Sequence, residues 1–163
     1  MLANVLTLAL LVALADDPDQ RERTTAPAEG FTTLTVNDMI FTARTVRFRA
    51  ENGSRTCVLE GKAKVRFGDI SITADSIQCN GKGELEVLSC VGNCTWRQDD
   101  GSGEVFRADQ LEVQQDGLRL SGNASLRYGS SEHATVVTCD SIVLRHGNDG
   151  YEFVGNVRLR RSK

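Results

Sequence analysis

The stretch VLSCVGNCTWRQ, residues 87–98, decides the fold, because it alternates apolar and polar side chains around a glycine. Counting from Gly92 in steps of two gives Leu88, Cys90, Cys94 and Trp96, all of them apolar. A period of two is typical of a half-buried β-strand, whose successive side chains point to opposite faces. The stretch therefore predicts a strand in which the two cysteines replace ordinary apolar residues.

The same pattern recurs along the chain. Glycines spaced by 31, 30 and 33 residues align four segments: LEGKAKVRF (59–67), CVGNCTWRQ (90–98), LSGNASLRY (120–128) and FVGNVRLRR (153–161). A second pattern alternates with the first: FTARTVRF (41–48), ITADSIQC (72–79), FRADQLEV (106–113) and VTCDSIVL (137–144). Eight matched segments indicate four copies of a unit of about 31 residues over positions 39–161.

The second pattern shifts its phase once in each copy. Its apolar positions fall at and two before a small pivot residue, then three and five after it, as in Ile72, Ala74, Ile77 and Cys79. A step of three within a period of two predicts an extra residue that bends the strand. Three aspartates occupy that step and are expected to accept hydrogen bonds from backbone amides exposed by the bend: Asp75, Asp109 and Asp140.

The segments between the predicted strands are rich in Asn, Asp and Gly, as hairpin turns require. No stretch has a helical period. The chain is therefore predicted to be all-β, with about eight bent antiparallel arms stacked rung on rung around one apolar interior.

The overall composition is that of one soluble globular domain. The chain has 163 residues, of which 40% are hydrophobic and 25% charged. Its net charge of −3 gives no whole-chain attraction to nucleic acid or to an anionic membrane, and we expect no nucleic-acid partner.

The N-terminus predicts export. Residues 1–15 are almost uninterruptedly apolar, end in Ala-Leu-Ala and precede a charged segment, which is the pattern of a cleavable signal peptide. An N-terminal strand or buried helix is the alternative. Residues 16–35 are polar with both prolines and are expected to form a flexible leader, and residues 36–163 the domain.

Candidate reactive residues are few. All five cysteines fall at inward positions, where buried thiols that fill space are the simplest interpretation. Cys57 and Cys79 could be neighbours across rungs, and an exported protein could then join them in a disulfide. Metal ligation by Cys79, Cys90 and Cys94 would require the strand to break. The two histidines lie in turn segments with no nucleophile beside them, so we expect no enzyme, cofactor or metal.

An arginine follows each repeat glycine by five positions, giving an outward row of Arg66, Arg97, Arg127 and Arg160. Such a row is either a solvated face that suppresses aggregation or a contact for an anionic ligand.

The segments ITADSIQC, FRADQLEV, LSGNASLRY and FVGNVRLRR, in order, resemble the OstA-like family. This family comprises the periplasmic lipopolysaccharide-transport proteins LptA and LptC and the N-terminal domain of LptD. The resemblance covers residues 39–161 and implies a β-jellyroll, a V-shaped roll of two sheets. It also implies a periplasmic bridge that carries lipopolysaccharide between the membranes in an apolar groove and stacks head to tail.

The resemblance implies lipopolysaccharide or lipid A as ligand, LptC-like and LptD-like proteins as partners, and a head-to-tail homo-oligomer. The inward residues expected to line the groove are Phe41, Ile72, Leu88, Trp96, Phe106, Leu120, Leu126, Phe153 and Leu159. The alternative is a non-catalytic scaffold with a filled core that polymerises through its edges without a lipid.

Overall fold

The computed structural model describes residues 24–25, 30–36, 39–51, 53–81, 85–99, 101–114, 116–129, 133–145 and 150–161. The expected signal peptide, residues 1–15, lies outside this part of the chain. Within it, no helix is long and apolar enough to cross a membrane.

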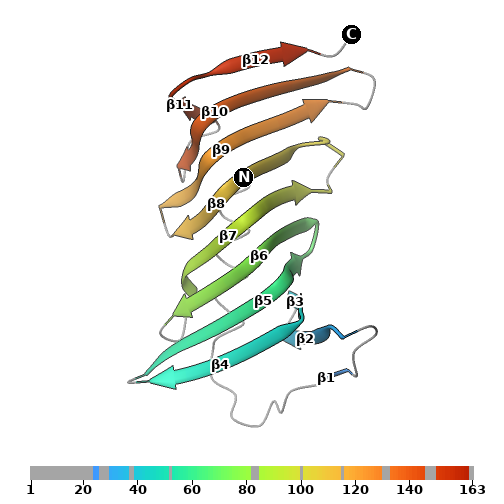
Figure 1. Ribbon diagram of the computed structural model, residues 1–163, viewed down its shortest axis with the longest axis vertical. Coiled ribbons are helices and arrows are strands. Elements are labelled where there is room, and N and C mark those ends of the chain that lie inside the picture. Colours follow the sequence, from blue (N-terminus) through green and yellow to red (C-terminus); the bar gives the residue numbers. More distant parts are fainter. Residues whose placement is uncertain are drawn as a thin grey trace.

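The described residues form one antiparallel sheet of twelve strands, and the prediction of an all-β fold is confirmed. The strands follow one another up the sheet in chain order, from β2 and β4 at one end to β12 at the other (Figure 1). Their bounds are β1 Thr24–Thr25, β2 Thr32–Val36, β3 Met39–Ala43, β4 Thr45–Glu51, β5 Ser54–Phe67, β6 Ile70–Gly81, β7 Leu85–Gln98, β8 Val105–Gln114, β9 Gly117–Gly129, β10 Ala134–Arg145, β11 Glu152–Val154 and β12 Arg158–Arg161.

Residues 24–25 and 32–35 correct the expected leader of residues 16–35, because they belong to the paired strands β1 and β2. The sequence Thr-Leu-Thr-Val alternates in polarity, and Leu34 turns inward and is buried. Its partner across the ladder is Phe41 of β3. The polar character of residues 16–35 as a whole hides this short alternation.

The long strands are interrupted along a common line. The ladder between β5 and β6 shifts register between Glu60 and Ala63, and equivalent shifts occur in the ladders that join β6 through β10. We call this line the hinge. The hinge divides each long strand into two halves. The halves on the side of β4 and β11 form the β4–β11 limb, and the halves on the side of β3 and β12 form the β3–β12 limb.

At both ends of the sheet the bent arm breaks into two strands. The first arm is β3 and β4, separated at Arg44, and the last is β11 and β12, separated over residues 155–157. β4, β11 and β12 each pair with one strand, and β3 pairs with β2 as well as β5, so no ladder bridges the bend on the outer side of either end arm. The two limbs are thus the two halves of the same bent arms, and they form the two layers of the molecule.

The inner faces of the two limbs bury one continuous apolar cluster. Leu59 and Ile142 of the β4–β11 limb and Ala63 and Ala124 of the β3–β12 limb are all fully buried. One face of a bare sheet would be exposed to water, so this burial requires each limb to cover the other.

Candidate functional site

In each of four arms, the hinge contains two consecutive residues whose backbone adopts the left-handed conformation, with positive φ. The pairs are Gly61–Lys62, Gly92–Asn93, Gly122–Asn123 and Gly155–Asn156, with φ between 39° and 80°. Glycine adopts this conformation without a Cβ penalty, and asparagine is the non-glycine residue that tolerates it best. The Gly-Asn dipeptide therefore sets the bend locally.

The structure places the three aspartates at the hinge, directly against these glycines. Asp75 accepts a hydrogen bond from the side-chain amide of Asn93 at 2.8 Å, and Asp109 accepts one from Asn123 at 2.8 Å. Asp140 and Asn156 make the same contact at 2.9 Å. An asparagine side chain donates to each of the three aspartates, whereas the sequence suggested backbone amides as donors.

The first arm departs from this arrangement. Arg44 stands where the others have aspartate, and Lys62 stands where they have asparagine. The aliphatic part of Arg44 packs over Gly61, and its guanidinium lies 5.8 Å from the ring centroid of Phe31. Two like charges exclude the carboxylate–amide contact, so packing and a cation–π interaction replace it.

The structure places eight of the nine predicted groove residues in the interior and one outside. Phe41, Ile72, Leu88, Trp96, Phe106, Leu120 and Leu126 are buried, and Phe153 is half-buried against them. Leu159, predicted to face the groove, is 59% exposed because it lies on the end strand β12. The interior is therefore a packed apolar layer in this structure, with its end rung uncovered.

Tyr151 joins the two limbs at the end of the interior farthest from the hinge. Its ring meets Phe106 of the opposite limb edge-on at 5.3 Å between centroids, and it lies 6.3 Å from Phe153 of its own limb. Its hydroxyl donates to Glu104 at 2.7 Å. No repeat position predicts this contact, because Glu104 lies outside the repeated segments.

The five cysteines are buried free thiols. Burial raises the pKa of Cys57 to about 12 and that of Cys94 to about 11, and it raises the pKa of Cys79, Cys90 and Cys139 as well. A thiol in this state is not a nucleophile at neutral pH, since the thiolate is the reactive form.

Two of the thiols hydrogen-bond to the hinge. Cys94 donates to the carbonyl of Asp109 at 3.5 Å, and Cys139 donates to that of Ser141 at 3.1 Å. Cys57 and Cys79 face each other directly across the ladder between β5 and β6. Four of the five thiols thus have an identified partner, either a carbonyl at the hinge or the opposed cysteine.

The described residues contain no group of three His, Cys, Asp or Glu side chains that could hold a metal ion. His133 is exposed beside β10, and His146 lies outside the described residues. A hollow of about 500 Å³ opens at the tip of the β4–β11 limb, next to the turn between β8 and β9. Its walls combine charged side chains, including Glu112, Arg119 and Arg145, with Leu118 and Leu144, which belong to or pack against the apolar cluster, so the hollow borders the interior at this tip.

Comparison with known proteins identifies the fold. No protein-family model and no curated protein sequence matches the chain. Among solved structures, the chain is similar to LptH from Pseudomonas aeruginosa, described as the LptA-homologous periplasmic component of the lipopolysaccharide transport device. The TM-score is 0.59 at 14% identity, over 75% of this chain and 93% of LptH. The chain therefore has an LptA-like fold.

Proposed function

We propose that this protein is a periplasmic lipid-binding bridge that carries lipopolysaccharide between two membranes without catalysis. The observation that carries the proposal is the interior: one apolar layer, continuous from β3 to β11, between limbs that are covalently joined only along the hinge. Acyl chains entering this layer would gain about 0.8 kcal/mol per buried CH₂ group. The fold shared with LptH supports the same role.

Entry of a lipid requires the limbs to part. Away from the hinge, Tyr151 and Glu104 make a polar contact between the limbs, and the inner faces otherwise meet through the apolar cluster. Apolar surface is not directional, so acyl chains can replace one inner face as the partner of the other. The two limbs then open by rotating about the Gly-Asn hinge.

Native mass spectrometry tests the proposal. The protein purified from a lipopolysaccharide-producing host, or incubated with lipid A, is expected to carry an adduct of glycolipid mass. Leu120→Asp places a charge in the fully buried layer and should abolish the adduct. Ser121→Asp is the matched control, because the next residue points to the outer face of the same strand.

A second measurement covers the case in which Leu120→Asp does not fold. Benzoylphenylalanine in place of Phe106, which is buried, should cross-link to lipid A on illumination, and in place of Val91, which is 55% exposed on the outer face, it should not. Equal cross-linking at both positions, or a clean apo mass throughout, would contradict lipid carriage.

The closed interior favours a second candidate, a scaffold that polymerises through its sheet ends without a ligand. Leu59, Leu88, Leu120 and Ile142 have no exposed surface, as in an ordinary protein core. Filaments that form in lipid-free protein, together with no uptake of lipid A, would establish this alternative.

A further inference from the structure

The outer face of the β3–β12 limb carries charges of one sign. Cross-strand pairing arranges its side chains in two rows that run from β5 to β12. The first row is Arg66, Ser71, Arg97, Val105, Arg127, Val136 and Arg160, and the second is Lys64, Thr73, Thr95, Arg107, Ser125, Thr138 and Arg158. These rows contain seven cations and no carboxylate. We call this surface the cationic face.

The cations are accessible and evenly spread. All seven are exposed, and the residues between them are short Ser, Thr and Val side chains that leave the charged groups standing above the surface. The four arginines of the first row lie on alternate strands, so they repeat about every 10 Å over roughly 30 Å. The face is thus a broad array rather than a pocket for one ion.

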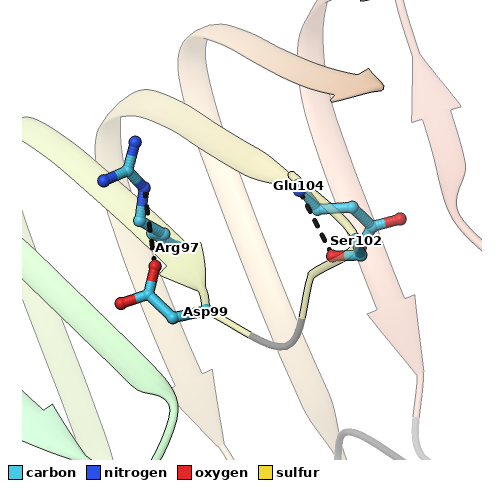
Figure 2. A network of polar contacts seen from close by, with 4 residues as sticks. All are labelled: Arg97, Asp99, Ser102 and Glu104. Atoms are coloured by element: carbon cyan, nitrogen blue, oxygen red, sulfur yellow. Dashed lines mark hydrogen bonds and ion pairs between the residues drawn. The ribbon is translucent and has the colours of Figure 1, made fainter. Parts of the chain in front are cut away.

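The charges on this face are almost unpaired. Within the described residues, the only one of the seven with an ion-pair partner is Arg97, which meets Asp99 at 3.9 Å, beyond the end of β7 (Figure 2). Asp69 and Asp99 are confined to the turns at the limb's tip. The net charge of the chain is −3, so these cations gather on one limb against the overall balance.

The outer face of the other limb provides the contrast. There Arg47 pairs with Glu60 at 3.1 Å, Arg145 pairs with Glu152 at 3.8 Å, and Arg119 lies opposite Glu112 in the ladder. Both faces belong to the same strands and are equally open to solvent. Solubility alone would be served by the mixed pattern on either face, so the segregation on one limb needs another reason.

We propose that the cationic face docks the protein on a membrane surface rich in anionic phospholipid. Phosphate head groups form an extended array of negative charge, which complements an extended array of cations spread over seven strands. Each basic residue near such a surface contributes a similar, additive attraction. Docking by this face would hold a single molecule with its stacked strands along one membrane, a state distinct from an end-to-end bridge between two, and would direct the β4–β11 limb away from that membrane.

Nucleic acid fits the face less well. The described part of the face has no aromatic side chain on which bases could stack, and a broad sheet face presents no helix or two-stranded ribbon to a groove. A duplex is therefore treated as a competing outcome of the test.

Sedimentation with vesicles tests the proposal. The protein is expected to bind vesicles of phosphatidylcholine with 30% phosphatidylglycerol at low salt and to dissociate from them at 0.5 M NaCl. It is expected not to bind vesicles of pure phosphatidylcholine. Both kinds of vesicle offer acyl chains and differ only in the charge of their head groups. A difference in binding between them therefore tests the cationic face and not the proposed carriage of lipid in the interior. Arg97→Gln with Arg127→Gln should weaken binding about 30-fold, since each cation contributes about a factor of five.

The matched control is Arg47→Gln with Arg119→Gln, which removes the same charge from the other limb and should leave binding within about twofold of the wild type. Equal weakening by both double variants would overturn the proposal, because net charge alone would then explain binding. So would failure of the wild-type protein to bind anionic vesicles, or stronger binding to a DNA duplex than to vesicles at the same salt. Circular dichroism of each variant verifies that the sheet is intact.

Discussion

Gly122 meets Asp109 across the hinge, and the contact leaves no room for a Cβ atom. A Cβ built on Gly122 would lie 2.7 Å from the Asp109 carboxylate and 2.9 Å from its Cβ. The glycine also has a φ of 72°, which L side chains rarely adopt. Two separate constraints therefore select glycine here, and the same pair of constraints recurs at Gly92 and Gly155.

Gly122→Ala should lower the free energy of unfolding by about 2 to 4 kcal/mol, of which about 1 to 2 kcal/mol comes from the left-handed backbone. Gly101→Ala separates the two causes, because Gly101 has a φ of 86° but nothing within 4 Å of the added Cβ. It should lose only the backbone part. In an Asp109→Ala background Gly122→Ala should cost less, and urea titrations of the four proteins would measure the coupling. Equal losses for Gly101→Ala and Gly122→Ala would contradict the steric account.

The buried thiols make stability depend on alkaline pH. The pKa of Cys57 is raised to about 12 by burial, against about 8.5 in an unfolded chain. Below pH 8 the thiol is neutral in both states and the stability is full. As pH rises above 8.5 the unfolded chain releases the proton while the folded chain keeps it, so stability falls until about pH 12.

Between pH 8 and 10 this loss should reach about 1 to 2 kcal/mol for each such thiol. The Cys57→Ala variant is expected to show a smaller fall over that range in urea unfolding, although it starts from a lower stability at pH 7. A wild-type protein and a variant with parallel pH profiles would show that Cys57 is not the titrating group.

At the scale of the strands, the sequence predicts the interior arms well and the end arms poorly. Leu88, Cys90, Cys94 and Trp96 are inward and buried, as the period of two indicates. Leu159 follows the same pattern yet is exposed, because periodicity reports which face a residue takes and not whether another layer covers that face. The contact of Tyr151 with Phe106 could not be predicted, since it depends on how far apart the limbs lie.

The ladder between β5 and β6 makes a disulfide between Cys57 and Cys79 geometrically accessible. The two residues are directly opposed, and opposed Cα atoms in an antiparallel pair lie about 4.5 to 5.5 Å apart, within disulfide range. We expect mild oxidation to join them and to raise the free energy of unfolding by about 3 kcal/mol, the value for a loop of this length. Cys139 provides an internal control, because its strand β10 is four strands away from β6 in the sheet, about 19 Å at the usual strand spacing.

Peptide mapping after oxidation identifies the linkage, and alkylation in urea counts the remaining thiols. The expected product has Cys57 joined to Cys79 and three thiols left, since five are free before oxidation. Oxidation that joined Cys139 to Cys57 or Cys79 would mean that the linkage does not form within the β5–β6 ladder. Five reactive thiols after oxidation would mean that the opposed side chains do not reach each other.

At the scale of the molecule, the roll is uncovered at its two ends. Phe48 on β4 lies opposite Cys57 and so belongs to the inner face, yet it is 52% exposed. Leu159 is its counterpart on β12 at the other end. Both end strands also have an edge without a strand partner among the described residues, and such edges pair with other strands. The two ends differ from each other, so an end-to-end contact joins unlike surfaces.

A contact between unlike surfaces extends into a filament, and this makes the proposed head-to-tail assembly testable by mixing. Phe48→Lys and Leu159→Lys each block one end, so each variant alone should sediment as a monomer at concentrations where the wild type forms longer species. Mixed in equal amounts, they should form a dimer and nothing larger, because each retains the end that the other lacks. Val91→Lys is the control, since Val91 is 55% exposed but lies on the outer face of the central strand β7. Dimers of either variant alone would indicate contacts between like ends instead, and analytical ultracentrifugation distinguishes the two arrangements.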